Sequence, residues 1–173
     1  MYNRYHRSPD EWAVACHDTG VLSKDYFDST QVFKDEDFFR EACAELVQLF
    51  ADKGGARSPV VCVGVQMSAS PLAEMLSEYM FKWTGEKCHW VSPEKHGNGD
   101  DTVMVFPIKD AHFMKGRSVL LCEGDLTTGD AVQRTVDAVQ QCDGALLPFV
   151  LALCNSSSLE EIDGIKVISL VHR

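Results

Sequence analysis

Short runs of apolar residues alternate with amphipathic stretches along most of the chain. Such runs are typical of strands that are buried on both faces of a parallel sheet. The predicted strands are Val60–Val63, Cys88–Val91, Val103–Phe106, Val119–Cys122, Ala145–Cys154 and Lys166–Val171. Between them, apolar residues recur at helical spacing, and the predicted helices are Asp35–Asp52, Ser70–Lys82 and Asp130–Val139. This alternation predicts an α/β fold in which helices flank a parallel sheet.

The first 34 residues have a weaker pattern. A capping box with proline at the first helical position, Ser8–Glu11, predicts a short helix that ends near Asp18. Residues 19–33 are interpreted as a loop with short extended pieces. The sequence alone does not show whether the apolar residues of this loop pack as the edge of a lid or against a partner chain. These residues are Tyr26, Phe27, Val32 and Phe33.

Three connections between the predicted strands and helices are interpreted as irregular. Residues 64–70, which are rich in small side chains, are expected to form a loop. Lys109–Arg117 is expected to be a turn, and Leu159–Glu161 a turn or a short helix.

The strand Val119–Cys122 leads into an unusual series of polar residues. Glu123 and Asp125 place carboxylates at the carboxyl end of this strand, where ligands bind in open α/β sheets. Thr127–Gly129 then precedes a helix, so backbone N–H groups, hydroxyls and a favourable dipole come together. This stretch predicts a phosphate-binding cradle; the alternative is an ordinary strand–turn–helix connection. It contains neither GxxxxGK[ST] nor GxGxxG, which excludes a nucleotide P-loop and a dinucleotide fingerprint.

The sequence VLLCEGDLTTGDA, residues 119–131, resembles the phosphoribosyl pyrophosphate signature of the type I phosphoribosyltransferases. By this resemblance Glu123 is the first of two acids and holds the ribose 2′- and 3′-hydroxyls, and Asp125 assists if the loop aims it at the ligand. The substrate-binding residues of this segment are then Thr127, Thr128, Gly129, Asp130 and Ala131. The chain departs from the family pattern at two positions. Gly124 replaces the second acid, and Asp130 stands where the family has a small residue. A carboxylate at that point would repel a phosphate unless it turns outward as a helix cap.

The segment GVQMSASPLA, residues 64–73, resembles the pyrophosphate loop of the same family. The resemblance implies that its backbone N–H groups bind the pyrophosphate. The residues that would supply them are Gln66, Met67, Ser68 and Ala69. The alternative for this segment is a plain strand–helix turn.

The segment SPEKHGNGDD, residues 92–101, is polar, contains two glycines and lies between two predicted strands, as a flexible lid would. It resembles the mobile loop of the orotate phosphoribosyltransferases. By this resemblance Lys95 contacts the pyrophosphate bound in a neighbouring subunit, and His96 belongs to the substrate site. The alternative is a solvated hairpin tip. The family's Arg-Lys pair is Ser92-Pro93 here, and Asn155 stands where the orotate enzymes carry a base-binding arginine.

The resemblance implies a fold and a reaction. The fold is a phosphoribosyltransferase-like parallel sheet flanked by helices, with a flexible lid loop and a small N-terminal hood-like segment. The reaction transfers ribose 5-phosphate from phosphoribosyl pyrophosphate to a nitrogenous base and releases pyrophosphate, in nucleotide synthesis or salvage. Lys95, Glu123 and Asp125 are the implied catalytic residues, and Mg²⁺ is the implied cofactor, near Glu123 and Asp125 through ribose hydroxyls or water. Two alternatives are a catalytically impaired protein that senses phosphoribosyl pyrophosphate or a nucleotide, and an unrelated flavodoxin-like domain.

Length and composition limit the other possibilities. The 173 residues fit one domain, with residues 1–34 as the N-terminal helix and hood-like segment and residues 35–173 as the core. The net charge of −10 disfavours nucleic acids and anionic membranes as partners. No apolar run approaches a membrane span, and the N-terminus has no signal-peptide core.

The cysteines and the N-terminal aromatic residues suggest a compartment and an oligomeric state. The seven cysteines include no CxxC pair, and Cys62, Cys122 and Cys154 lie in apolar runs. This usage favours reduced thiols and a cytoplasmic location. A homodimer is expected, with apolar area from Trp12, Tyr26, Phe27 and Phe33.

Overall fold

The structure, a computed structural model, describes residues 6–7, 14–15, 22–23, 26–55, 60–97 and 101–172. Among these residues, no helix has both the length and the apolar composition needed to cross a membrane.

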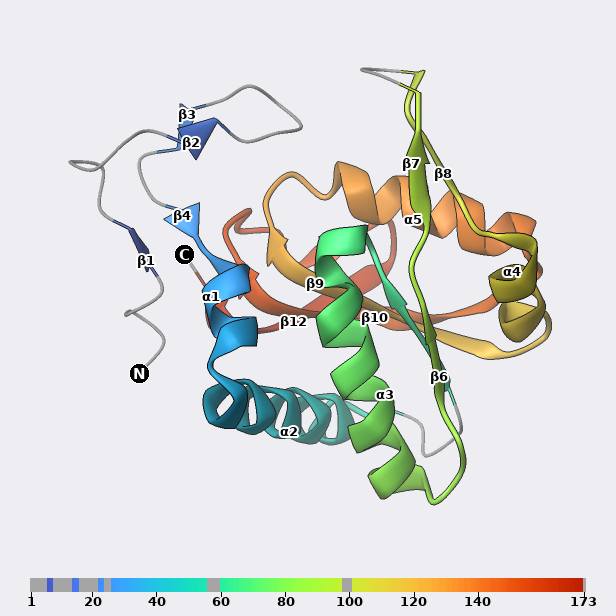
Figure 1. Ribbon diagram of the computed structural model, residues 1–173, viewed down its shortest axis with the longest axis horizontal. Helices are drawn as coiled ribbons and strands as arrows, with labels where there is room; N and C mark the ends of the chain where they lie inside the picture. Colours follow the sequence, from blue (N-terminus) through green and yellow to red (C-terminus); the bar gives the residue numbers. More distant parts are fainter. Residues whose placement is uncertain are drawn as a thin grey trace.

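A six-stranded sheet in the order β6-β5-β9-β10-β12-β11 forms the centre of the described part of the chain (Figure 1). Neighbouring strands are parallel, except that β11 runs antiparallel to β12. The predicted mainly parallel sheet is therefore confirmed. The strands are β5 (Val60–Gly64), β6 (His89–Val91), β9 (Ser118–Leu126), β10 (Ala145–Asn155), β11 (Glu161–Ile162) and β12 (Ile165–His172).

Helices cover both faces of this sheet, so the fold has three layers (Figure 1). Helices α2 and α3 pack on one face, and α5 lies on the other face with α4 at its end. The helices are α1 (Ser29–Lys34), α2 (Glu36–Asp52), α3 (Ser70–Thr84), α4 (Ile108–Met114) and α5 (Asp130–Gln141), and a 3₁₀ turn, η3 (Met67–Ala69), precedes α3. The three long helices confirm the periodicity of the sequence.

Three short antiparallel pairs complete the described structure. Strand β1 (His6–Arg7) pairs with β4 (Tyr26–Phe27), and β2 (Val14–Ala15) pairs with β3 (Leu22–Ser23). Strand β7 (Glu94–His96) pairs with β8 (Val103–Val105) to form a hairpin that extends away from the sheet (Figure 1).

The core consists of two apolar clusters on opposite faces of the sheet, and β9 contributes to both. Leu120 and Cys122 belong to the cluster under α2 and α3, whereas Val119 and Leu121 belong to the cluster under α5. This is the alternation of a strand that is buried on both faces.

The six cysteines among the described residues are free thiols, and five of them are buried. Burial raises the pKa of the Cys43 and Cys122 thiols. These thiols are therefore protonated at neutral pH and belong to the core.

The strand order predicts a ligand crevice at the carboxyl ends of β5 and β9. After β5 the chain continues to β6 on one side, and then returns to β9 on the other side of β5. In doubly wound sheets, such a reversal opens a crevice at the carboxyl ends of the two strands. The loops that follow β5 and β9 are the two segments predicted to bind pyrophosphate and phosphate.

The N-terminal part differs from its prediction in two places. Val14–Ala15 is a strand paired with Leu22–Ser23, although a helix to Asp18 was expected. A helix of this length is marginal without packing partners, so the capping box does not decide the structure; the rest of the expected helix, with Ser8–Glu11, lies outside the described residues. Residues 29–34 form α1, where a loop was expected, because Asp28 caps the helix and Val32 is buried.

The alternative left open for the N-terminal apolar residues is decided for two of them. Phe27 and Val32 are 2% and 1% exposed and belong to the chain's own core. Phe27 therefore contributes no apolar area to a dimer surface. Trp12 and the side chain of Tyr26 lie outside the described part, and the homodimer stays a prediction.

Two later connections were also predicted wrongly. Part of the expected turn 109–117 is the helix α4, whose first turn is held by Asp110 and Ala111 N–H groups on the Pro107 carbonyl and whose end is anchored by the buried Met114. Glu161 lies in β11 rather than in a turn or helix, because Glu161–Ile162 pairs with β12. Both elements depend on contacts with distant residues, which local patterns do not contain.

Candidate functional site

The two acids predicted for the site lie near the carboxyl end of β9. Side chains alternate along the first part of β9, so Glu123 follows Val119 and Leu121 on the α5 face. Gly124 lies on the opposite face, toward α1. The alternation does not continue to the end of the strand, because Leu126 also belongs to the cluster under α5, and Asp125 lies beside Cys154 of β10 in the register of the sheet.

Glu123 is held close to the backbone. Its side chain is 7% exposed, and its Oε1 accepts a 2.7 Å hydrogen bond from the N–H of Gly124. This bond orients one oxygen of the carboxylate. A ribose diol, which offers two O–H donors, matches such a carboxylate.

Asp125 is partly exposed and linked to the neighbouring strand. Its Oδ1 accepts a 2.7 Å hydrogen bond from the hydroxyl of Ser156, which follows β10. The loop after β10 therefore orients the second carboxylate. Nothing in the sequence pattern singled out Ser156 for this contact.

The predicted cradle has the geometry of a turn that leads into a helix. Thr127 and Thr128 are exposed, and Gly129 has a φ of +86°, a conformation that glycine adopts without steric cost. The first N–H groups of α5 have no partner inside the helix. One of them, that of Asp130, donates to the Thr128 Oγ1 at 3.3 Å.

The Asp130 side chain does not cap the helix. The N-cap residue of α5 is Gly129, which has no side chain. The Asp130 side chain is exposed at the first position of the helix, where a carboxylate is favoured by the helix dipole.

A buried hydroxyl connects the two predicted ligand loops. Thr135 of α5 is 0% exposed, and its Oγ1 lies 2.9 Å from the carbonyl oxygen of Val65 and 2.8 Å from that of Ala131. Val65 opens the loop after β5. Ala131, which is half-buried against the core, lies one helical turn before Thr135. Its carbonyl is the second acceptor within reach of this hydroxyl.

The loop after β5 is more regular than expected. Residues Met67–Ala69 form the 3₁₀ turn η3, and the N–H of Ala69 donates to the carbonyl of Gln66 at 2.9 Å. Ala69 is also fully buried, so its N–H is not free for a ligand. Met67 and Ser68, at the exposed start of the turn, keep N–H groups without a partner in the turn.

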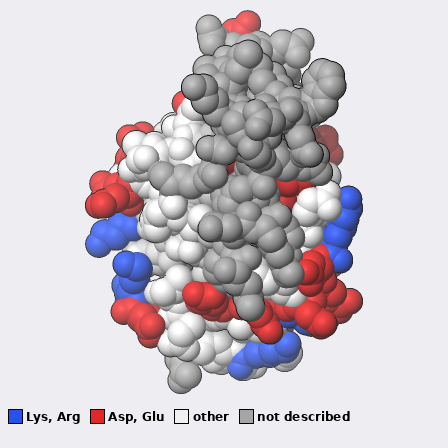
Figure 2. Space-filling model, turned by 90° about the vertical axis from the view of Figure 1, so that its left-hand side faces the viewer, with Lys and Arg blue, Asp and Glu red and all other residues white. Residues whose placement is uncertain are grey.

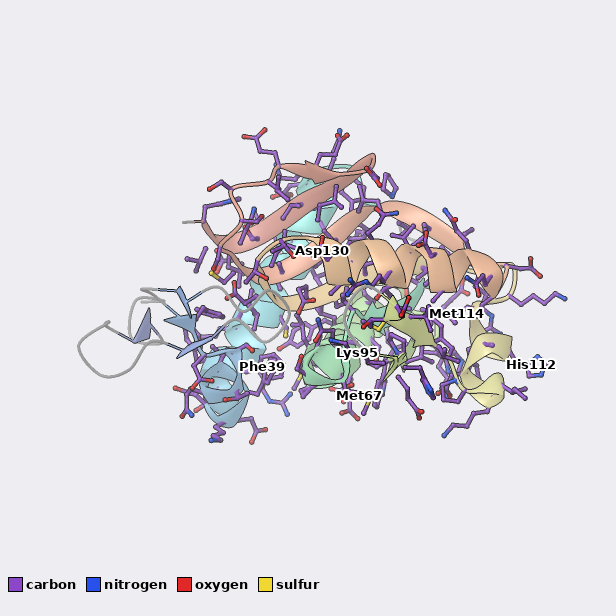
Figure 3. All side chains as sticks on the ribbon, turned by 90° about the horizontal axis from the view of Figure 1, so that it is seen from above. Phe39, Met67, Lys95, His112, Met114 and Asp130 are labelled. Carbon is purple, nitrogen blue, oxygen red and sulfur yellow. The ribbon has the colours of Figure 1, made fainter. Side chains whose placement is uncertain are left out.

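The segment interpreted as a lid loop forms the β7–β8 hairpin, and residues 98–100 lie outside the described ranges. Lys95 is directly opposite Met104. Side chains of such a pair lie on one face of the hairpin, and Met104 is buried with the residues of α5. Lys95 therefore lies on the face toward α5; Figure 3 labels it together with Met67, in the turn before α3, and Asp130, at the start of α5.

His96 lies on the other face of the hairpin. It is opposite Val103, which is 54% exposed, and its Nε2 is 3.5 Å from a Glu94 carboxylate oxygen. The alternation favours Lys95 over His96 as the residue that reaches the crevice, and the binding role of His96 stays a prediction.

Asn155 is occupied by its own loop. It is 1% exposed; its Nδ2 donates to the Leu159 carbonyl at 2.7 Å, and its Oδ1 accepts from the N–H and the hydroxyl of Ser157. The residue at the place of the family's base-binding arginine thus shapes the loop that carries Ser156.

Ser92 is likewise structural. It is 8% exposed, and its hydroxyl accepts a 2.8 Å hydrogen bond from Ser70 at the start of α3. The position where the family has a cation is therefore filled by a buried hydrogen bond.

The acids of the site fit a hard divalent cation only in part. Carboxylate oxygens suit Mg²⁺, and Glu123 and Asp125 lie two residues apart near the end of β9. In the described ranges, no group of three or more His, Cys, Asp or Glu side chains is arranged to hold a metal. A cation here would need further ligands from its substrate and from water.

Comparison with known proteins identifies structures of similar fold. No established family profile matches the chain. Among solved structures, the adenine phosphoribosyltransferase of Rhodothermus marinus is similar with a TM-score of 0.68 and 17% identity, over 99% of this chain and 96% of the other. The orotate phosphoribosyltransferase of Mycobacterium tuberculosis is similar with a TM-score of 0.66 and 18% identity, over 99% and 91%. The orotate phosphoribosyltransferase of Aeropyrum pernix is similar with a TM-score of 0.65 and 16% identity, over 93% of this chain and 84% of the other.

One curated protein is similar in sequence. It is the transcriptional regulator GfcR of Haloferax volcanii, with 28% identity over 116 residues, 65% of this chain and 52% of the regulator. The chain thus spans about half the length of the curated relative that it matches.

These likenesses show the fold. The chain has the type I phosphoribosyltransferase fold, as the resemblance of its signature implied, and it is not an unrelated flavodoxin-like domain.

Proposed function

We propose that the protein binds phosphoribosyl pyrophosphate in the crevice between β5 and β9 and transfers its ribose 5-phosphate to a nitrogenous base. The observation that carries this proposal is the placement of Glu123 and Asp125 near the carboxyl end of β9, directly before a Thr-Thr-Gly turn at the N-terminus of α5. The two carboxylates match a ribose diol, and the Thr-Thr-Gly turn at the helix N-terminus matches a phosphate. The similar solved structures include enzymes for orotate and for adenine, so they support the reaction class and leave the base open.

Each part of the site has a role in this reaction. The Thr127–Gly129 turn and the start of α5 bind the 5′-phosphate, and Glu123 accepts hydrogen bonds from the ribose hydroxyls. The N–H groups at the start of η3 and the ammonium of Lys95 neutralise the departing pyrophosphate. Because the transition state develops positive charge on the ribose, fixed carboxylates and a held leaving group supply most of the rate enhancement.

Magnesium is the cofactor we propose, with Glu123 and Asp125 as the chain's contribution beside the oxygens of the substrate. When bound, it would offset the negative charge of the pyrophosphate. We also propose a cytoplasmic location and a homodimer.

Calorimetric titration of phosphoribosyl pyrophosphate with and without Mg²⁺ tests the proposal. We expect Mg²⁺-dependent binding to the wild type and a loss of affinity of at least about tenfold in Glu123→Ala, because hydrogen bonds to a charged group contribute about 1.5–3 kcal/mol. Glu161→Ala, which removes an exposed acid on β11, is the matched control and should bind as the wild type does. No binding at millimolar ligand would contradict the proposal.

A second candidate function is that of a sensor that binds phosphoribosyl pyrophosphate or a nucleotide without turnover. It is favoured by Gly124 in place of an acid, by the structural use of Ser92 and Asn155, and by the sequence likeness to a transcriptional regulator. Incubation with Mg²⁺, phosphoribosyl pyrophosphate and a panel of bases separates the two. Release of pyrophosphate with any base supports the enzyme, whereas binding without release with every base supports the sensor.

A further inference from the structure

The space beside Gly124 is occupied by helix α1. A Cβ atom at residue 124 would lie 2.9 Å from the Oγ and 3.1 Å from the Cβ of Ser29, and 3.9 Å from the Cζ of Phe33. The first of these distances is shorter than carbon and oxygen atoms tolerate without a bond. The φ of Gly124 is not in the left-handed region that favours glycine, so the missing side chain provides space and not backbone freedom.

Helix α1 has little room to move away from this contact. The Asp28 carboxylate caps its first turn by accepting from the Thr30 N–H at 3.2 Å. Val32 is 1% exposed in the core, and the ring of Phe33 packs edge-on against Phe39 of α2 with centroids 5.0 Å apart. Anchors at both ends therefore hold Ser29 over Gly124.

The same glycine holds the first acid of the site. The Gly124 N–H donates to Glu123 Oε1 at 2.7 Å, so the peptide between residues 123 and 124 orients the carboxylate. The Cα of Gly124 faces Ser29 of α1, since an atom added there would meet it, and the Gly124 N–H faces the acid. A displacement of α1 would move this peptide and, with it, the carboxylate.

We propose that helix α1, packed beside the Cα of Gly124, positions Glu123 for ribose binding. This inference rests on the proposed function, because it assigns Glu123 to the ribose. Gly124 stands where the family has its second acid. In this chain, that position connects the N-terminal helix to the ligand site. The phosphate cradle at Thr127–Gly129 does not depend on this contact.

A rescue experiment tests the positioning role. Gly124→Ala places a Cβ against Ser29, and Ser29→Gly removes both atoms that this Cβ would meet, leaving only the 3.9 Å contact with Phe33. The double variant should therefore return α1 to its wild-type position. Thr30→Gly in the Gly124→Ala background is the matched control, since it places the same residue in the same helical turn and leaves Ser29 in place.

Two readouts distinguish positioning from general destabilisation. Calorimetry compares ribose 5-phosphate, which needs Glu123, with inorganic phosphate, which needs only the cradle. Hydrogen–deuterium exchange of residues 29–34 reports whether α1 stays in place. For Gly124→Ala we expect about tenfold weaker binding of ribose 5-phosphate, unchanged binding of phosphate, and faster exchange in α1. Ser29→Gly should reverse these changes, and Thr30→Gly should not.

The outcomes separate this inference from the proposed function. Equal losses for ribose 5-phosphate and phosphate, unchanged exchange in α1, or failure of Ser29→Gly to rescue would each overturn the positioning role. If the wild type binds neither ligand, the proposed function fails, and the positioning role, which requires ribose binding by Glu123, fails with it.

Discussion

At the scale of the residue, the buried hydroxyl of Thr135 connects the parts of the site most directly. It lies within hydrogen-bonding distance of the Val65 and Ala131 carbonyls, and so it joins the loop after β5 to the helix that carries the phosphate cradle. Without this donor, the Val65 carbonyl would lose a partner in a region that excludes water. Such an unsatisfied group costs about 1–3 kcal/mol.

We therefore expect Thr135→Val to lower the free energy of unfolding by about 1–3 kcal/mol in urea denaturation. It should also increase hydrogen exchange in residues 65–69, because the loop loses its link to α5. Thr135→Ser keeps the hydroxyl and serves as the control: it loses only the packing of one methyl group, and the exchange of the loop should stay at the wild-type level. Equal exchange in both variants would show that the hydroxyl does not hold the loop.

At the scale of the element, the β7–β8 hairpin has two distinct faces. Lys95 and Met104 lie on the face toward α5, whereas Glu94, His96, Val103 and Val105 lie on the exposed face. Lys95 and His96 thus differ in what they can reach. The hairpin can present one charge to the crevice while its other face remains in solvent.

We expect Lys95→Ala to weaken binding of phosphoribosyl pyrophosphate by a few-fold to about tenfold, since exposed charge contacts contribute up to about 1 kcal/mol and more when desolvated. His96→Ala, on the opposite face, should change the affinity by less than about twofold. The loss in Lys95→Ala should shrink as salt is raised, because salt screens exposed charges. A larger effect of His96→Ala in the same calorimetric titration would reverse the assignment of the two faces.

The elements also differ in how far the sequence alone could predict them. Helix α2 and the apolar part of strand β9 could be predicted from the local pattern. A wide apolar stripe is compatible with few structures other than a helix, and a short continuous apolar run with few other than a buried strand. Helix α1 and helix α4 did not, because six or seven residues form a helix only where distant residues bury Val32 and Met114. The role of Ser156 and the contact of Ser29 with Gly124 join residues far apart in the chain, so no local signal could have indicated them.

At the scale of the whole molecule, the net negative charge disfavours binding of the proposed ligand, which is an anion. The chain carries a net charge of −10, and acidic side chains are spread over the face shown in Figure 2. Five of the described cations, Lys82, Lys87, Lys109, Lys115 and Arg117, belong to α3, α4 and the adjoining residues rather than to the crevice loops. An anionic ligand must therefore be held by backbone N–H groups, a few side chains and a cation.

His89, at the start of β6, gives this distribution a measurable effect on stability. Its ring stacks on Phe113 with centroids 4.4 Å apart; burial, and then the charges of Lys87 and Arg117, lower the pKa of His89 below its usual 6.5. The folded chain thus resists a proton that the unfolded chain accepts. The stability from neutral His89 is present above about pH 6.5 and is lost as the pH falls through the folded pKa.

We expect the unfolding free energy of the wild type to fall, relative to that of His89→Gln, as the pH is lowered from 7 to 5. The comparison with the variant removes the effect of the carboxylates, which titrate in both proteins. Urea denaturation at each pH gives this difference, and NMR titration of the His89 ring should give a pKa below 6.5. A pKa above 6.5 would contradict the burial argument.

The position of the crevice between β5 and β9 also has a consequence for the life of the protein in the cell. These two strands are neighbours in the sheet but are separated in the chain by α3, β6, the hairpin and α4. A nascent or partly unfolded chain therefore has no crevice, and a ligand that binds there selects the completed fold. At a concentration 100 times its dissociation constant, such a ligand adds about 2.7 kcal/mol to stability. The supply of phosphoribosyl metabolites would then set how long each molecule escapes proteolysis.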